Sequence, residues 1–133
     1  MKHILVGYDE TPPAERALER AAELAKKFEA EVTVASIAGV LHGVVAGAVA
    51  DPPAVHAQQL QHARDKLAEL GVEIETVTGV GDPATALVAI AAERKADMII
   101  VGTHGRPGLG RLLLGSVSDD VEHKAHCDVL IVH

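Results

Sequence analysis

The stretch from residue 102 to residue 116 combines residue types that can bind phosphate. It holds five glycines, two arginines and one histidine, and it ends in Gly115-Ser116. An apolar run, Met98–Val101, precedes it, and a helical pattern follows it. Glycines between a strand and a helix let backbone N–H groups converge on an anion, which the positive end of the helix dipole also attracts. The stretch therefore predicts a phosphate-binding loop, with the candidate residues Gly102, His104, Gly105, Arg106, Gly115 and Ser116.

A flexible surface loop is the simpler explanation of the same stretch, with glycines that only make turns. The combination of glycines, arginines and a hydroxyl group at the helix start favours phosphate binding. Arg106 and Arg111 either neutralise outer phosphates or are solvated. Gly110 and Gly115 have the spacing of a P-loop, but the lysine of that motif is absent. This excludes a Walker-type NTPase site.

Asp9 is a second candidate, because it stands between an apolar run, His3–Val6, and the first helical pattern. A carboxylate at this point can accept hydrogen bonds from ribose hydroxyls, or it can cap the amides of the following helix. Taken alone, Asp9 is better explained as a cap. Together with the glycine-rich stretch, the ribose role is favoured.

Two further groups of residues mimic functional motifs. Gly79–Ala84 resembles a dinucleotide fingerprint, but Asp82 would place negative charge where a pyrophosphate must lie. Asp82-Pro83 is better explained as the start of a helix. His123, His126 and Cys127 lack the additional ligands that complete a metal site, so we predict no bound metal there. No nucleophile motif or pair of carboxylates indicates catalytic residues.

Composition narrows the class of partner. The 133 residues carry a formal net charge of −7, which argues against nucleic acid and anionic membrane surfaces. One Tyr, one Phe and no Trp make stacking on nucleic acid bases a poor explanation as well. A single cysteine and no visible signal peptide predict a reducing, cytoplasmic location.

Residues 32–50 carry no Asp, Glu, Lys or Arg, which is long enough to span a bilayer. Three glycines and several polar residues lower the hydropathy of this stretch, and no aromatic belt flanks it. We therefore interpret it as a strand followed by a glycine-rich loop and not as a membrane helix.

Alternating strands and helices must position the candidate residues. Apolar runs predict five strands, at His3–Val6, Val32–Ile37, Val72–Val77, Met98–Val101 and Val129–Val132. Helical spacing predicts four intervening helices, marked by Thr11 and Pro12 at the first start, Gly71 at the second end, Asp82-Pro83 at the third start, and Val117, Val121 and Ala125 along the fourth.

This alternation predicts an α/β fold, a parallel sheet with helices on both faces, in one domain over residues 1–133. Glu73 and Glu75 mark the third strand as an edge. Ligands of such sheets bind beyond the carboxyl ends of the strands. The segments 7–10, 37–39 and 102–105 are therefore expected to share one cleft.

The spacing Gly102-x2-Gly105-x9-Gly115-Ser116 resembles the nucleotide-binding signature of the universal stress protein family. The resemblance covers residues 2–132 and also includes Asp9, Ala25-Lys26-Lys27, Gly81–Ala84, Ala96-Asp97 and the segment from Cys127 to Val132. It implies a five-stranded parallel sheet ordered 3-2-1-4-5 and the binding of ATP with Mg²⁺, or of AMP or another adenine nucleotide.

By position, the resemblance implies that Asp9 lies near the ribose and that the Ile37 backbone contacts the adenine edge. It also implies that Val101, Gly102, Gly105, Gly115, Ser116 and Val117 surround the ribose and phosphates. This chain departs from the family pattern at Tyr8 and at Asp128, which replaces a proline, and residues 38–53 carry no readable signature.

Three functions follow as hypotheses. The first is an ATP-binding regulatory protein of the stress response. The second is a slow ATPase or nucleotidyl-transfer enzyme, and the third is a ligand-free dimeric scaffold. We also expect a homodimer through Val129–Val132, because an apolar edge strand without charge is a template for pairing with a second chain.

Overall fold

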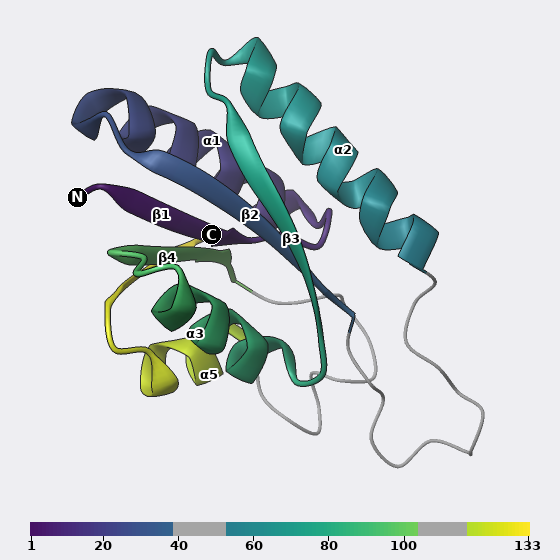
Figure 1. The fold of residues 1–133 in the computed structure, drawn as a ribbon, viewed down its shortest axis with the longest axis vertical. Coiled ribbons are helices and arrows are strands. Elements are labelled where there is room, and N and C mark those ends of the chain that lie inside the picture. The colour runs from purple at the N-terminus through teal and green to yellow at the C-terminus, as the bar shows by residue number, and fades with distance from the viewer. Residues whose placement is uncertain (39–52, 104–116) are drawn as a thin grey trace.

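Five parallel strands form one sheet in the computed structural model of the protein, in the order β3-β2-β1-β4-β5 (Figure 1). The structure describes residues 1–38, 53–103 and 117–133. The strands are β1 (His3–Gly7), β2 (Glu31–Ala38), β3 (Ile74–Val80), β4 (Met98–Gly102) and β5 (Asp128–Val132). The helices are α1 (Pro12–Phe28), α2 (Pro53–Glu69), α3 (Pro83–Glu93) and α5 (Val117–Lys124). This is the strand order that the family resemblance implied.

The helices cover both faces of the sheet: α1 and α2 lie on one face, and α3 and α5 lie on the other (Figure 1). Successive side chains of a strand point to opposite faces, so each strand contributes to two cores. In β1, Ile4 and Val6 pack under α1 and α2, whereas Leu5 packs under α3 and α5. The central strand is therefore buried on both sides, as its continuous apolar sequence predicted.

Local capping explains where the helices begin and end. Thr11 is the N-cap of α1, and Asp82 is the N-cap of α3, where its carboxylate accepts a hydrogen bond of 3.0 Å from the Thr85 N–H. After α2, Gly71 has a φ of +82°, and the Val72 N–H donates to the Leu67 C=O at 2.8 Å. This is a Schellman motif, in which glycine supplies the left-handed residue. All three predicted helix signals are confirmed.

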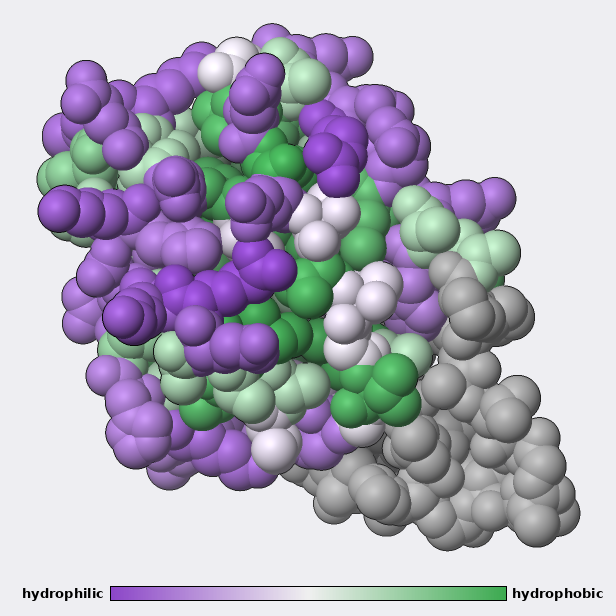
Figure 2. Space-filling model, viewed as in Figure 1, coloured by the Kyte–Doolittle hydropathy of each residue, from purple (hydrophilic) through white to green (hydrophobic). Residues whose placement is uncertain are grey.

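The predicted bounds of the third strand were wrong at both ends. We predicted Val72–Val77, but the strand starts at Ile74 because the Val72 N–H is bound in the turn after α2. β3 is the edge strand that its acidic residues predicted, although Glu73 precedes the strand. In Figure 2, apolar and neutral residues show through between polar ones on the face where β3 and α3 lie in front. Val80, at the end of this edge, is 73% exposed.

The stretch of residues 32–50 begins as the predicted strand, since β2 runs to Ala38. Residues 39–52 lie outside the described residues, and so do residues 104–116, which include most of the glycine-rich stretch. Among the helices that the structure describes, none has the length and apolar character needed to cross a membrane.

Candidate functional site

The carboxyl ends of three strands meet at one edge of the sheet. Gly7, the last residue of β1, is paired with Ala35 of β2 and with Val101 of β4. The chain segments that hold Asp9, Ile37 and Gly102 therefore continue from neighbouring positions. The described parts of the three predicted segments, residues 7–10, 37–38 and 102–103, therefore lie at the same edge of the sheet, and the shared cleft stays a prediction.

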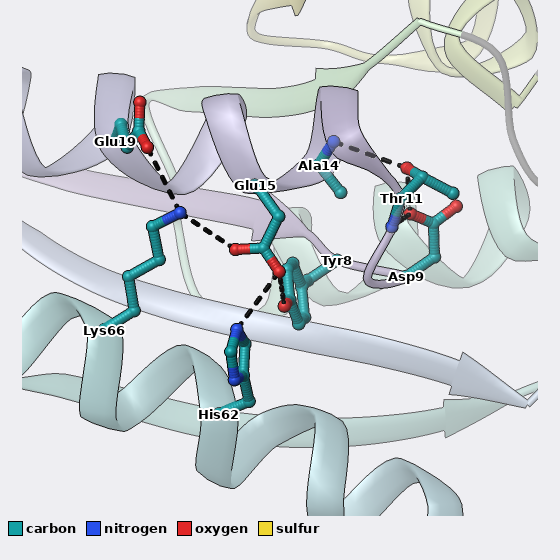
Figure 3. A network of polar contacts seen from close by, with 8 residues as sticks. All are labelled: Tyr8, Asp9, Thr11, Ala14, Glu15, Glu19, His62 and Lys66. Atoms are coloured by element: carbon teal, nitrogen blue, oxygen red, sulfur yellow. Dashed lines mark hydrogen bonds and ion pairs between the residues drawn. The ribbon is translucent and has the colours of Figure 1, made fainter.

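Asp9 braces the turn between β1 and α1 (Figure 3). Its Oδ1 atom accepts hydrogen bonds from the Thr11 N–H at 3.1 Å and from the Thr11 hydroxyl at 2.6 Å. Thr11 in turn caps α1 by accepting from the Ala14 N–H at 3.4 Å. Asp9 thus supports the cap residue instead of capping the helix amides itself. Both of these bonds to Asp9 use its Oδ1 atom.

The peptide groups of Ile37 point toward β1, beyond the last residue of β1 that pairs with β2. The register of β1 with β2 ends at Gly7 and Ala35, and the Tyr8 N–H donates to the Ala35 C=O at 2.9 Å. Successive residues of a strand direct their peptide groups to opposite neighbours. The Ala38 C=O accepts from the Gly81 N–H on the β3 side, so the Ile37 groups point toward β1. There the chain has already turned away at Asp9, next to Glu10 with a φ of +61°.

Gly102 is required by packing. A Cβ atom at this position would lie 2.7 Å from the carbonyl carbon of Pro13 and 2.8 Å from the nitrogen of Ala14. The end of β4 therefore approaches the backbone at the start of α1 more closely than any other residue type allows. Val101, 3% exposed, points to the opposite face and belongs to the core under α3 and α5, against which Ile37 and Val117 also pack.

The remaining predicted site residues, His104, Gly105, Arg106, Gly115 and Ser116, lie outside the described residues. The structure brings Asp9, Ile37, Val101 and Gly102 to the carboxyl edge, and Val117 packs against the core under α3 and α5. A phosphate-binding role for the glycine-rich stretch stays a prediction.

Sequence reasoning missed a polar network beside Asp9 (Figure 3). Tyr8 is 3% exposed, and its hydroxyl donates to Glu15 of α1 in a short hydrogen bond. The Glu15 carboxylate also contacts two residues of α2, Lys66 at 3.0 Å and His62 at 3.2 Å. The Tyr8 and His62 rings stack with their centroids 6.4 Å apart. The network therefore ties α2 to the residue that precedes Asp9.

The network shifts the acidity of its members. Burial and the bond to Glu15 raise the pKa of Tyr8. Burial alone would raise the pKa of Glu15, but the hydrogen bonds from Tyr8 and Lys66 outweigh it and lower this pKa. Burial alone would lower the pKa of Lys66. The carboxylates of Glu15 and Glu19 outweigh burial and raise this pKa. The signal in the sequence was a lone tyrosine after a buried strand, with Glu15 in the first turn of α1.

The two motifs rejected as sites have structural roles. The Asp82 carboxylate accepts from Thr85 and pairs with Lys124 of α5 at 3.6 Å. The His123 ring donates to the Asp119 C=O at 2.7 Å, one turn earlier in the same helix. Burial, with the nearby charge of Asp128, raises the pKa of the Cys127 thiol. The Asp82–Lys124 pair thus joins α5 to the start of α3, whereas the His123 bond lies within α5.

Comparison with known proteins gives the same family from the sequence and from the fold. A model described as the universal stress protein family matches residues 1–133. Universal stress protein MJ0531 of Methanocaldococcus jannaschii is 34% identical over 138 residues, covering 98% of this chain and 81% of that protein. Universal stress protein YxiE of Bacillus subtilis is 33% identical over 145 residues, covering 97% of each chain.

Two solved structures share the fold and contain an adenine nucleotide. A universal stress protein in complex with cAMP is similar with a TM-score of 0.78 and 31% identity, covering 99% of this chain and 97% of that one. The universal stress protein from Archaeoglobus fulgidus in complex with dAMP is similar with a TM-score of 0.75 and 27% identity, covering 100% of this chain and 98% of that one. Proteins of this fold can therefore hold adenine nucleotides.

Proposed function

The chain belongs to the universal stress protein family, and we propose that it is a regulatory protein of the stress response that binds ATP with Mg²⁺. The base and ribose bind at the ends of β1 and β2. The phosphates bind to the glycine-rich stretch that follows β4.

The observation that carries the proposal is the gap beside Ile37. An N–H and a C=O of one strand residue face a space that β1 leaves when it turns at Asp9. A backbone donor and acceptor side by side match the N1 acceptor and the amino donor of adenine. The Oδ2 atom of Asp9 lies on the same turn and accepts from the ribose hydroxyls. The cAMP and dAMP complexes of similar proteins support this choice of ligand class.

The phosphate half of the proposal rests on the sequence. Gly102 ends β4, and α5 begins at Val117, so the predicted loop spans a strand end and a helix start. Backbone amides at such a junction bind phosphate, and Arg106 and His104 are placed within the same stretch. Ser116, directly before α5, supplies a hydroxyl to the phosphates.

Calorimetric titration with ATP and Mg²⁺ tests the proposal. The double variant Gly105→Val, Gly115→Val places side chains where phosphate oxygens approach, so the affinity for ATP should fall at least about tenfold. Leu70→Ala, at the opposite end of the sheet, is the matched control and should bind as the wild type does. Unchanged ATP affinity in a folded double variant would refute the phosphate site.

The chemistry expected at this site is binding. No carboxylate or lysine has been identified that would position an attacking water, so hydrolysis should be negligible beside the enzyme median of about 10 s⁻¹. Hydrolysis near that rate, lost in Ser116→Ala, would show that the protein is an ATPase.

We also propose that the protein dimerises through β5. This strand is the second edge of the sheet, and Val129–Val132 carry no charge. Two copies related by a two-fold axis would pair these strands antiparallel and close the assembly. Leu130→Lys and Ile131→Pro should each shift the mass measured by light scattering from dimer to monomer. A monomeric wild type at high micromolar concentration would contradict this interface.

A further inference from the structure

Three polar side chains are buried between the end of β2 and the start of α2. Ser36 is 1% exposed, His56 is 5% exposed and Gln59 is 2% exposed. The Ser36 hydroxyl lies 2.5 Å from the His56 Nδ1 atom and 2.8 Å from the Gln59 Oε1 atom. We call these three residues the β2–α2 cluster. It lies one residue before Ile37 in the strand.

The proton arrangement of the β2–α2 cluster follows from its donors and acceptors. A hydroxyl group has one proton, and Ser36 donates it to the Gln59 carbonyl oxygen. The His56 Nδ1 atom must then be protonated and donate to the Ser36 oxygen. The three side chains thus form a directed chain of hydrogen bonds from α2 to the strand and back to α2.

Apolar packing alone would fasten α2 at lower cost. Further along the same face of the helix, Leu60, Ala63 and Leu67 pack in the core with exposures of 7% or less. Burying polar groups costs free energy that their hydrogen bonds only partly recover, and apolar replacements are often equally stable. What directed hydrogen bonds add is a single geometry. The cluster occurs at the end of α2 that adjoins the carboxyl edge of the sheet.

We propose that Ser36, His56 and Gln59 are positioning residues that fix the end of β2 and so make the Ile37 backbone selective for adenine. This inference rests on the proposed function. The Ser36 side chain holds the strand from the α2 face, while the Tyr8 N–H and the Gly81 N–H hold the Ala35 and Ala38 carbonyls on either side. Ile37 lies between these anchors. Guanine presents an acceptor and a donor in the reverse order to adenine, so a rigid backbone rejects it whereas a loosened one adapts.

The test replaces the cluster by apolar residues in the triple variant Ser36→Ala, His56→Leu, Gln59→Leu. We expect this variant to fold with a thermal midpoint close to that of the wild type. The amides of Tyr8 and Gly81 should exchange with solvent about tenfold faster, because the strand end between them has lost its anchor. The Glu31 amide, which donates to the Lys2 C=O at the other end of β2, should exchange at the wild-type rate.

Titration with ATP and with GTP completes the test. The ratio of the two affinities should fall about tenfold in the triple variant, mainly through loss of ATP binding. Leu60→Met, an apolar exchange on the same helix, is the matched control and should keep both the ratio and the exchange rates. Gln59→Met, which removes one acceptor, should show a smaller change of the same kind and serves if the triple variant does not fold.

The outcomes separate this inference from the proposed function. A wild-type protein that binds no adenine nucleotide refutes the proposed function, while the exchange rates still decide whether the cluster fixes the strand end. Unchanged exchange at Tyr8 and Gly81 overturns the inference. Faster exchange with an unchanged ratio of ATP to GTP affinity also overturns it, because the cluster would then have a structural role alone.

Discussion

The two ends of the strands use their polar groups differently. We call the end where the strands begin the amino edge, and the end where they finish the carboxyl edge. At the amino edge, the Asp97 carboxylate accepts from the Lys2 N–H at 2.7 Å and from the His3 N–H at 2.9 Å. The His3 ring spans the Arg94 C=O at 3.1 Å and the Thr33 hydroxyl at 2.8 Å. At the carboxyl edge, the Ile37 peptide groups point to the side where β1 has left the sheet, and the Asp9 carboxylate accepts from Thr11.

We therefore expect stability and ligand binding to depend on different edges. Polar groups of the amino edge are bonded to one another and join β1, β2, β4 and the end of α3. At the carboxyl edge, Asp9 accepts from Thr11, and the neighbouring Tyr8 donates to Glu15 of α1. Changes at the amino edge should therefore alter stability, and a change of Asp9 at the carboxyl edge should alter binding.

The largest expected effect is a loss of stability at the carboxyl edge, which would show that this edge does not serve binding alone. Gly102→Ala places a Cβ atom against backbone atoms of Pro13 that have no room to move, so the free energy of unfolding should fall by about 3 kcal/mol. Gly7→Ala is the matched control, because its Cβ atom meets the flexible end of Leu87 and should cost about 1 kcal/mol. Urea unfolding measures both. Equal losses would show that the approach of β4 to α1 is not the constraint.

A change at the amino edge tests whether stability can be lowered there without altering ATP binding. Thr33→Val keeps the shape of a buried side chain but removes the partner of the His3 Nε2 atom, at a cost of about 2 kcal/mol in unfolding free energy. Affinity for ATP, measured by calorimetry on the folded variant, should stay at the wild-type value. A weakened affinity would mean that the amino edge also serves the site.

The converse change is Asp9→Asn at the carboxyl edge. Asparagine can still accept from the Thr11 N–H, so thermal unfolding should change little. Losing the charged acceptor for the ribose should weaken ATP binding about tenfold, or about 1.4 kcal/mol. A stability loss with unchanged binding would assign Asp9 to the turn alone.

Acid should weaken the support behind the carboxyl edge. The pKa of Glu15 is lowered in the folded protein, so its contribution is present above the unfolded pKa and is lost as pH falls through the folded pKa. As the pH falls below the ordinary glutamate value of 4.5, the wild type should lose more unfolding free energy than Glu15→Gln does. Chemical denaturation at several pH values gives both curves. If the two curves run parallel, Glu15 does not contribute to the loss of stability in acid.

The smallest expected effect is a gain in unfolding free energy from a change at the amino edge. Glu29 ends α1 with a φ of 54°, the position that Gly71 occupies after α2 with a φ of +82°. Glu29→Gly should therefore raise the unfolding free energy by about 0.5 to 1 kcal/mol. Gly71→Ala should lower it by a similar amount. A loss of stability in Glu29→Gly would show that the Glu29 side chain contributes more than its backbone strain costs.

Residue patterns predicted the fold well because its signals are local. Alternating apolar runs, Thr11 and Asp82 as caps, and Gly71 after α2 each fix an element by short-range chemistry. Strand order followed from the family resemblance. The start of β3 was misplaced because Val72 has the side chain of a strand residue, while its N–H is bound in a turn.

The site was predicted in part. Asp9 and Ile37 lie at the carboxyl edge as expected, because Asp9 comes two residues after β1 and Ile37 is next to the last residue of β2, while their roles toward a ligand stay predictions. The Tyr8 network and the β2–α2 cluster were missed because their members are far apart in the chain. His56 and Gln59 look like exposed helix residues in the sequence, yet they face the sheet.

The central place of β1 has a consequence for synthesis. β1 leaves the ribosome before both of its neighbours and pairs with Glu31–Ala35 on one side, but its other side waits for Met98–Val101. Until β4 has been made, an apolar strand edge stays open on the growing chain, and β5 has no strand to join. Contacts so distant in the chain form late and leave partly folded chains prone to association. We therefore expect the nascent protein to depend on chaperone protection until its last third emerges.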